Sequence, residues 1–301
     1  MFDIKDKNVL ITGATSGIGR AAAINLSLIG ANIFFVARDE GKAQFLLDDI
    51  NKISGKEAIP IIADLSSQSD IRRAAQKFNK LNLPLHVLLN NAGLINKERK
   101  ETVDGLEEVF AINHLAYFLL TMLLLDRIKE ASNSRIVNVS SGAHAFVKGF
   151  NFEDYQAKNA YKPFQVYGYS KLANILFTKK LSGILKEDNI TVNCLHPGVV
   201  GTSFGQNNGN LQKILFYIAK PFMRSSEKGA ETSIYLCSSS EVSDVSGEYF
   251  YNIARCIDEN PVNPNKKRKS IGTEQTFSQD ITSEDFILNM LHDIANELEK
   301  R

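Results

Sequence analysis

Strand-like and helix-like segments alternate along most of this chain, and this alternation constrains the fold more than any other feature. Six short runs are almost continuously apolar and rich in β-branched or aliphatic residues; they lie at 8–12, 32–37, 58–63, 87–90, 135–140 and 191–195. Strands that alternate with helices pair in parallel through right-handed crossovers. Runs without a polar face are expected in a sheet that helices cover on both sides. The pattern predicts a doubly wound α/β domain with a parallel sheet of about seven strands.

Length and charge fit a single domain over residues 1–301, with its core at about 7–251. The chain has 301 residues, of which 44% are hydrophobic, and no repeat or low-complexity linker divides it. Such a chain can bury a full core. Its net charge of +1 gives no electrostatic reason to expect nucleic acid or an anionic membrane as the main partner.

Cysteine usage and hydropathy predict a cytoplasmic protein without a transmembrane segment. Cys194, Cys237 and Cys256 lie far apart and show no C-x-x-C spacing, so they support neither a disulfide framework nor a zinc site. No signal-peptide segment precedes the first strand, and the longest apolar run, 115–125, is far shorter than the roughly 20 residues of a membrane span. We expect that run to form a buried or interface helix.

A glycine-rich loop follows the first predicted strand and opens a helix. Residues 12–19 read T-G-A-T-S-G-I-G. Glycines at such a turn let the backbone approach a pyrophosphate held at the helix N-terminus, as in Rossmann-type domains. A tight turn without a ligand is the alternative. The loop residues that we expect to bind the cofactor are Gly13, Ser16, Gly17, Ile18 and Gly19.

The end of the second strand indicates which nicotinamide cofactor is bound. Arg38 stands where an acidic residue would hold the adenine-ribose 2′-hydroxyl. An arginine there suits a 2′-phosphate, so NADP(H) is favoured over NAD(H). Asp39 follows it and either accepts the ribose hydroxyl or, more in keeping with its position, caps the helix that starts at Glu40.

Two further strand ends carry polar residues that suit the same cofactor. Asp64 and Leu65 follow the third strand, where a carboxylate can accept from the adenine amino group; a helix cap among Ser66 and Ser67 is compatible with that role. The segment 90–93, N-N-A-G, ends the fourth strand. Ligands of doubly wound sheets bind at this carboxyl edge, so we expect cofactor contacts there, with a simple turn as the alternative. The expected contacts are Asn91, Ala92 and Gly93.

Tyr167 and Lys171 lie four residues apart in a predicted helix, so their side chains share a face. A cation about 5 Å from a phenol, at an effective dielectric of about 20, favours its ionisation by roughly 3 kcal/mol, or about two pKa units. That effect would make Tyr167 a usable acid/base near neutral pH. The spacing alone is weak, and an exposed pair without function is the alternative.

Five motifs in this order and spacing resemble the short-chain dehydrogenase/reductase family. They are T-G-x-x-x-G-x-G at 12–19, N-N-A-G at 90–93, the serine pair at 140–141, Y-x-x-x-K at 167–171 and P-G at 197–198. Segments 112–114, 135–141 with 143–144, 168–178 and 195–200 look most like the retinol dehydrogenase-like branch. The chain departs from that branch at 115–117, which read Leu-Ala-Tyr where Leu-Gly-His is usual, and it shows no hydrophobic N-terminal anchor.

The resemblance implies a catalytic tetrad of Asn113, Ser141, Tyr167 and Lys171. Tyr167 would exchange a proton with the substrate oxygen as hydride is transferred, and Ser141 would orient that oxygen. Lys171 would hold the nicotinamide ribose, and Asn113 would position a water for proton relay. Ser140 is expected to be structural.

The resemblance also implies that a segment after the sixth strand fixes the nicotinamide carboxamide. The residues concerned are Pro197, Gly198, Val200 and Thr202. Residues 201–224 are expected to form a substrate lid, with a plain packing helix as an equal alternative. The long connection 142–165 and the lid would determine the substrate.

The remaining features receive no role in catalysis. His114, His144 and His196 show no metal-ligand spacing, so we interpret them as packing or supporting residues and expect no metal. Residues 261–301 are expected to form a loop and a C-terminal helix. The basic run 266–269 is interpreted as a solvated surface loop.

The sequence therefore predicts an NADP(H)-dependent oxidoreductase that transfers a hydride between nicotinamide and an apolar alcohol, aldehyde or ketone. If the substrate were a chlorophyll-type precursor, a steroid or a quinone, the class of enzyme would stay the same. The alternative from another class is a catalytically silent NADP(H)-binding regulatory or scaffold protein on the same fold. The resemblance further suggests a homodimer or homotetramer.

Overall fold

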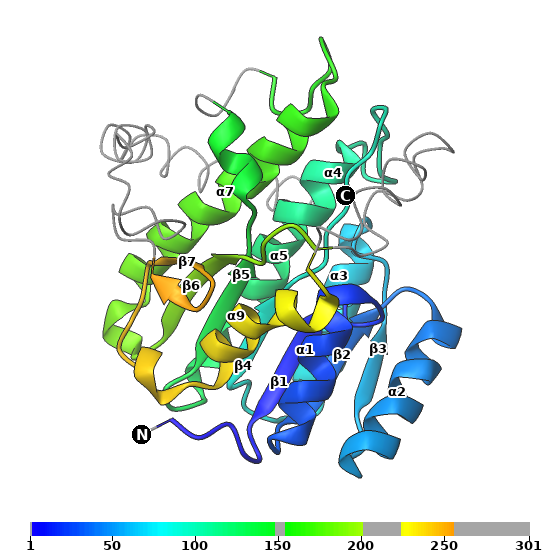
Figure 1. Ribbon diagram of the computed structural model, residues 1–301. Coiled ribbons are helices and arrows are strands. Elements are labelled where there is room, and N and C mark those ends of the chain that lie inside the picture. The colour runs from blue at the N-terminus through cyan, green and yellow to red at the C-terminus, as the bar shows by residue number, and fades with distance from the viewer. Residues whose placement is uncertain (1, 148–153, 201–223, 256–301) are drawn as a thin grey trace.

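The computed structural model describes residues 2–147, 154–200 and 224–255 (Figure 1). These residues form an eight-stranded sheet in the order β3-β2-β1-β4-β5-β6-β7-β8. The strands are β1 Asn8–Thr12, β2 Asn32–Ala37, β3 Ile59–Ile62, β4 Val87–Asn90, β5 Arg135–Val139, β6 Thr191–His196, β7 Tyr249–Tyr251 and β8 Ala254–Arg255. Neighbouring strands pair in parallel except β7 and β8. The predicted doubly wound sheet is confirmed, and the two-residue antiparallel β8 is added to the seven parallel strands that were expected.

Helices cover both faces of the sheet (Figure 1). The main helices are α1 Gly17–Leu28, α2 Glu40–Ser54, α3 Gln68–Asn79, α5 Ala116–Leu123, α7 Pro163–Ile184 and α9 Ser226–Ser238. Shorter pieces are α4 Glu108–Phe110, η1 Ala111–Leu115, α6 Leu125–Lys129, η2 Gly142–Phe146, η3 Lys186–Asp188 and η6 Ser240–Val242. One buried apolar cluster joins α1, α2 and α9 to the sheet, and another joins α3, α5 and α7 to it. Residues 116–121 of α5 are all buried, as expected for the apolar run at 115–125.

Side-chain caps set the beginnings of the helices that start at the carboxyl end of the sheet. Asp39 accepts a hydrogen bond from the Lys42 amide at 2.8 Å and is the N-cap of α2. Ser67 caps α3 in the same way by accepting from the Asp70 amide. Such caps satisfy backbone donors that the helix leaves unpaired. The predicted capping role of Asp39 is thus confirmed.

Buried amides fix the position of α7 against the sheet. Asn90 of β4 donates from Nδ2 to Asn138 Oδ1 of β5 at 2.9 Å, and Asn138 donates in turn to the Thr178 hydroxyl of α7 at 2.9 Å. All three side chains are buried. A buried polar network that is hydrogen-bonded specifies one arrangement, because any shift leaves a group without a partner. The register of α7 over β4 and β5 is therefore well defined.

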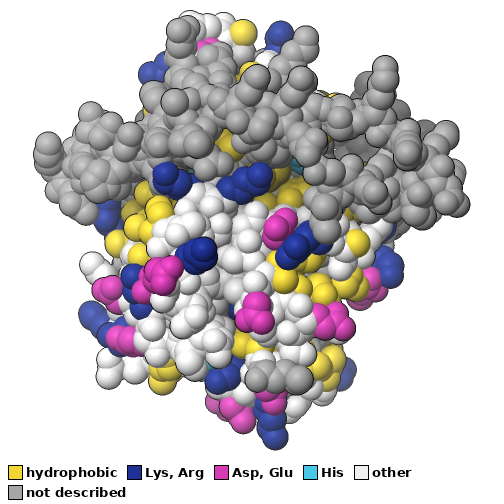
Figure 2. All heavy atoms as spheres, turned by 90° about the vertical axis from the view of Figure 1, so that its left-hand side faces the viewer, with side chains coloured by type: hydrophobic (Ala, Val, Ile, Leu, Met, Phe, Trp, Pro, Cys, Tyr) yellow, Lys and Arg dark blue, Asp and Glu magenta, His cyan; other side chains and the backbone are white. Residues whose placement is uncertain are grey.

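The parallel register brings the sequence motifs to one edge. Thr12 lies opposite Val36, and Asn90 lies opposite Asn138, so the carboxyl ends of β1, β2, β4 and β5 end side by side. No helix among the described residues is long and apolar enough to span a membrane. Figure 2 shows basic and acidic side chains interspersed with apolar ones on the face below the grey segments.

Candidate active site

Tyr167 and Lys171 face the carboxyl end of β5 from the N-terminal half of α7. Pro163 starts this helix, where its missing N–H is not needed. Lys171 Nζ lies 5.7 Å from the centre of the Tyr167 ring and donates to the Val139 carbonyl at 3.0 Å. Lys171 is 2% exposed, which excludes the alternative of an exposed pair without function. The predicted juxtaposition of the two side chains is confirmed.

Ser141 lies two residues after the end of β5 and meets the phenol of Tyr167. Its side chain hydrogen-bonds Tyr167 and also accepts from the Ala143 amide at 3.2 Å, which makes it the N-cap of η2. The neighbouring Ser140 is buried and donates to the Lys171 carbonyl at 2.7 Å. Ser140 is therefore structural, as predicted, and Ser141 is the serine that contacts the phenol.

The acidity of the Tyr167 phenol differs from the expectation. Burial raises the pKa of Tyr167 to about 12, and the hydrogen bond from Ser141 only partly opposes this. Burial also lowers the pKa of Lys171 to about 7. The expected drop of about two pKa units assumed a fully charged lysine beside a solvated phenol. That expectation is wrong for the protein alone, because both groups are desolvated and Lys171 is only partly protonated at neutral pH.

Asn113 lies in a widened helical turn, the π-helical segment η1. Its Oδ1 accepts from the Leu94 amide at 2.8 Å, and its Nδ2 donates to the Leu94 carbonyl at 2.9 Å and to the Ser170 hydroxyl at 3.1 Å. The residue is fully buried, so it is not a surface asparagine. Single π turns occur often at functional sites. This one joins the loop after β4 to the Tyr167 helix; the predicted water-positioning role stays a prediction.

The loop between β1 and α1 has the geometry of an anion site. Gly13 and Gly17 have φ of +68° and +53°, a region that glycine tolerates best. A Cβ at Gly19 would lie 2.2 Å from the Gly13 carbonyl oxygen. Ser16 is the N-cap of α1 but makes no side-chain capping bond, and the first turn carries no acidic residue. Backbone N–H groups at this N-terminus are thus left for a negatively charged ligand, which fits a pyrophosphate.

Asn91 holds this loop in place. Its Nδ2 donates to the Thr12 carbonyl at 2.9 Å and to the Gly13 carbonyl at 3.3 Å, while the Thr12 hydroxyl accepts from the amides of Asn91 and Ala92. The N-N-A-G segment is therefore tied to the glycine loop. Gly93 lies against Asn113 and Lys171, since a Cβ there would meet Asn113 Oδ1 at 3.2 Å and Lys171 Nζ at 3.4 Å.

Arg38 and Asp64 meet at the ends of β2 and β3. Arg38 Nη1 lies 3.9 Å from Asp64 Oδ2, and the arginine side chain is 71% exposed. Asp64 Oδ1 accepts from the Ser66 amide at 2.9 Å. The guanidinium is thus free to turn toward a ligand on the outer side of the loop, because an exposed contact at 3.9 Å holds it weakly.

The segment after β6 continues along the same edge. Gly198 has φ of +86°, and Val200 pairs with Arg224 in an isolated parallel bridge. Residues 201–223 of the expected lid at 201–224, which include Thr202, lie outside the described residues. So do residues 256–301 and residues 148–153 of the long connection. Among the described residues no group of His, Cys, Asp or Glu could hold a metal ion.

Sequence reasoning missed two residues around Lys171, one whose ring faces its ammonium and one that shares its hydrogen-bond acceptor. The ring of Tyr117, on α5, has its centre 5.6 Å from Lys171 Nζ, and its hydroxyl donates to the Ala92 carbonyl at 2.7 Å. Asn174 donates to the Val139 carbonyl, which also accepts from Lys171. The sequence held a signal for each residue. Tyr117 stands where the retinol dehydrogenase-like branch usually has histidine, and Asn174 follows Lys171 at the helical spacing i+3.

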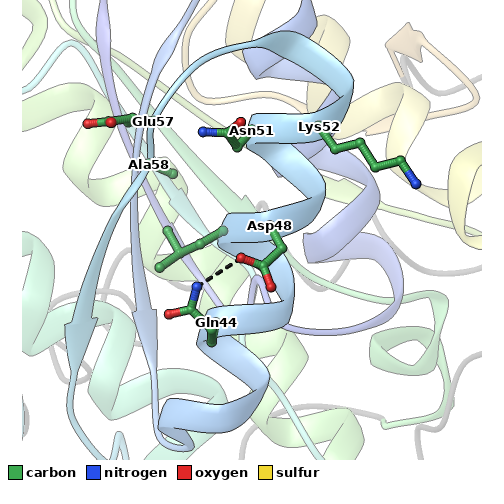
Figure 3. Close-up of a pocket in the computed structure, with 7 residues that line it drawn as sticks. Gln44, Asp48, Asn51, Lys52, Glu57 and Ala58 are labelled. Atoms are coloured by element: carbon green, nitrogen blue, oxygen red, sulfur yellow. Dashed lines mark hydrogen bonds between the residues drawn. The ribbon is translucent and has the colours of Figure 1, made fainter.

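A separate hollow of about 390 Å³ lies between α2 and the start of β3 (Figure 3). It is lined by Gln44, Leu47, Asp48, Asn51, Lys52, Glu57 and Ala58. The last two precede β3, so the hollow lies toward the amino end of that strand. It is remote from Tyr167 and is no part of the candidate active site.

Lys171→Met should stabilise the folded chain, although it removes the ammonium group from the candidate active site. Because the pKa of Lys171 falls from 10.5 to about 7 on folding, the unfolded chain binds more protons between these values and stability rises with pH across them. The lysine therefore destabilises the fold most below pH 7. At about 1.4 kcal/mol per pKa unit, we expect a gain on the order of a few kcal/mol at pH 6 that shrinks toward pH 10.

Urea unfolding at pH 6 and pH 9 measures this gain. Lys52→Met, at an exposed position of α2, is the control and should show no such pH dependence. A Lys171→Met protein that is no more stable than wild type at pH 6 would show that the buried Lys171 ammonium does not destabilise the fold.

Comparison with known proteins identifies the family. A family model described as short chain dehydrogenase matches residues 7–212. The chain belongs to the short-chain dehydrogenase/reductase family. Human retinol dehydrogenase 14 is 41% identical over 261 residues, which cover 81% of this chain and 77% of that protein. Human polyprenol dehydrogenase is 36% identical over 262 residues, covering 82% and 77%.

Solved structures share this short-chain dehydrogenase/reductase fold. The Pseudomonas aeruginosa RhlG/NADP active-site complex matches with a TM-score of 0.65 and 25% identity, over 83% of this chain and 95% of that one. The family and its retinol dehydrogenase relatives make this short-chain dehydrogenase/reductase an NAD(P)-dependent enzyme that acts on CH–OH donors. The resemblance inferred from the motifs is confirmed.

Proposed function

We propose that the protein is an NADP(H)-dependent oxidoreductase for apolar alcohols and their aldehydes or ketones, with Tyr167 as the general acid/base. The observation that carries the proposal is the meeting of three groups at one edge of the sheet: the Tyr167 phenol, the Ser141 side chain bonded to it, and Lys171 Nζ 5.7 Å from the phenol ring. A bound nicotinamide would supply or accept the hydride at the carbon of the substrate C–O bond.

Each residue has a defined task in this reaction. In the reducing direction, Ser141 donates a hydrogen bond to the substrate carbonyl oxygen, and Tyr167 gives that oxygen its proton as the carbon gains hydride. The oxidative direction reverses both transfers. Lys171, partly protonated at neutral pH, would hold the ribose hydroxyls of the nicotinamide cofactor, and these acceptors would favour its charged form. The charged lysine then stabilises the developing phenolate.

Two exposed phenylalanines support an apolar substrate. Phe164 precedes Tyr167 by about one turn of α7 and is 74% exposed; Phe146 ends η2, the segment that Ser141 caps, and is 85% exposed. Large exposed apolar side chains beside a site often mark a binding surface. The relatives named retinol and polyprenol dehydrogenases point to the same substrate class. Location in the cytoplasm and a homo-oligomeric state stay predictions.

A substrate screen with NADPH and NADH side by side tests this function. The panel should contain retinal, a polyprenal, a steroid ketone, a quinone and short aliphatic aldehydes, with the corresponding alcohols in the reverse direction. We expect turnover of the long apolar aldehydes. Tight NADPH binding without turnover of any compound would favour the silent regulatory or scaffold protein instead.

Arg38→Ala should change cofactor selectivity. A charge-assisted hydrogen bond to a phosphate contributes about 1.5–3 kcal/mol, so we expect NADPH to bind about 10- to 100-fold more weakly and NADH to lose less than about threefold. Isothermal titration with both cofactors measures this. Arg73→Ala, which removes an exposed arginine paired with Asp70 on α3, is the control. Equal losses for both cofactors would refute the contact between Arg38 and the 2′-phosphate.

A further inference from the structure

Two buried residues outside the predicted tetrad lie directly behind Lys171. Asn174 Nδ2 donates to the Asn113 carbonyl at 2.9 Å and to the Val139 carbonyl at 3.3 Å. Asn174 Oδ1 lies 2.8 Å from His114 Nδ1. Asn174 and His114 are both fully buried. The amide thus bridges η1, which carries Asn113, and the end of β5, where Lys171 is anchored.

The hydrogen-bond partners determine the orientation of this pair. Carbonyl oxygens only accept, so the atom of Asn174 that faces two of them must be the NH2 group. Its Oδ1 therefore faces His114 and must accept from an Nδ1–H. His114 is then neutral with its proton on Nδ1, which agrees with burial lowering its pKa to about 4. Its Nε2 has no partner and lies among the rings of Phe110 and Phe177.

The same geometry determines which acceptors Lys171 can reach. The Val139 carbonyl accepts from both Lys171 and Asn174, and Asn174 also uses the Asn113 carbonyl. No carboxylate forms an ion pair with Lys171 among the described residues, and the groups that face it are the rings of Tyr117 and Tyr167 and, further away, neutral His114. Without the Asn174 amide, the Asn113 carbonyl would lose this side-chain donor and the Val139 carbonyl would keep that of Lys171 alone. A buried acceptor that loses a donor strongly attracts a nearby ammonium.

We propose that Asn174, oriented by His114, is a positioning residue that occupies the Asn113 and Val139 carbonyls and so keeps the Lys171 ammonium directed toward Tyr167 and the cofactor. The role in the reaction rests on the function proposed above. The effect on Lys171 itself belongs to the protein alone and is measured without substrate.

Asn174→Leu tests the proposal, because it keeps the side-chain volume and removes the amide. Freed carbonyls should draw Lys171 inward and raise its pKa by at least one unit above that of wild type. Competitive labelling of the cofactor-free protein with fluorodinitrobenzene over a pH series, followed by mass spectrometry of the Lys171 peptide, measures this pKa. We expect kcat to fall at least tenfold, with the KM for the carbonyl substrate within about threefold.

Two further variants separate positioning from general stability. His114→Phe removes only the group that orients Asn174, so it should shift the Lys171 pKa in the same direction by a smaller amount, and the double variant should add nothing to Asn174→Leu. Thr178→Val is the matched control: Thr178 is buried one turn further along α7 and bonds the Asn174 carbonyl and Asn138. It should lower the thermal midpoint without moving the Lys171 pKa.

The outcomes are distinct. A Lys171 pKa that is the same in wild type, Asn174→Leu and Thr178→Val overturns the proposal, even if activity falls. A shifted pKa in a protein that turns over no substrate supports the positioning of Lys171 and refutes only the proposed reaction. If Asn174→Leu does not fold, His114→Phe against Thr178→Val decides by the same labelling experiment.

Discussion

Tyr167→Phe is expected to lower kcat/KM by about a thousandfold or more while changing cofactor affinity by less than about threefold. General acid/base catalysis contributes about 10²- to 10⁴-fold, and Tyr167 is the residue whose phenol hydrogen-bonds the Ser141 side chain. The ring remains and keeps its packing against Lys171, whose Nζ lies 5.7 Å from the ring centre. Steady-state kinetics and fluorescence titration with NADPH measure both quantities.

Tyr169→Phe provides the matched control for this variant. Tyr169 lies two residues further along α7, and its hydroxyl accepts from Gln165 Nε2 at 2.9 Å instead of contacting Ser141. The same chemical change there should leave kcat/KM within about twofold. A Tyr167→Phe enzyme with more than a tenth of the wild-type kcat/KM would show that another group supplies the proton.

Gly19→Ala should abolish cofactor binding, with a Kd for NADPH and NADH raised at least about 100-fold. The added Cβ would lie 2.2 Å from the Gly13 carbonyl and 2.5 Å from Asn91 Nδ2, so the loop must move away from the segment that holds it. Displaced backbone N–H groups no longer converge on the pyrophosphate. A displacement of about 1 Å at a binding site can cost about 100-fold, which is the size of the rise in Kd expected here.

Gly183→Ala is the control for the same substitution in a helix. A Cβ at Gly183 would meet nothing within 4 Å, and replacing a helical glycine by alanine stabilises by roughly 0.5–1 kcal/mol. Thermal unfolding should thus show a small gain for Gly183→Ala and a loss for Gly19→Ala. Cofactor binding within threefold of wild type in Gly19→Ala would refute the account of the loop.

The sheet and the glycine loop were predictable because their signals are local. Continuous apolar runs indicate covered parallel strands, and their order gave six of the eight strands, to within one residue at each end. The two-residue β8 at Ala254–Arg255 is too short to leave a pattern. The cap at Asp39 was also readable, because a single side chain and the turn that follows it determine it.

The electrostatics of the site were not predictable from spacing. The spacing of Tyr167 and Lys171 predicts proximity, and the structure confirms it. It cannot give the desolvation of either group, which depends on Tyr117, Val139 and the helices around them and raises the pKa of Tyr167 to about 12. The role proposed for Asn174 could not be predicted from the sequence either, because its partners Asn113 and Val139 are more than thirty residues away in the chain.

Transfer of deuterium from NADPH labelled at C4 of the nicotinamide to an apolar aldehyde is the most direct test of the account. Both C4 epimers are incubated with wild type, Tyr167→Phe and Tyr169→Phe, and the alcohol is analysed by mass spectrometry. The proposed mechanism predicts one deuterium at the carbinol carbon from one epimer, with wild type and Tyr169→Phe but not with Tyr167→Phe. Wild-type protein that binds NADPH and transfers no label to any aldehyde of the panel would contradict it.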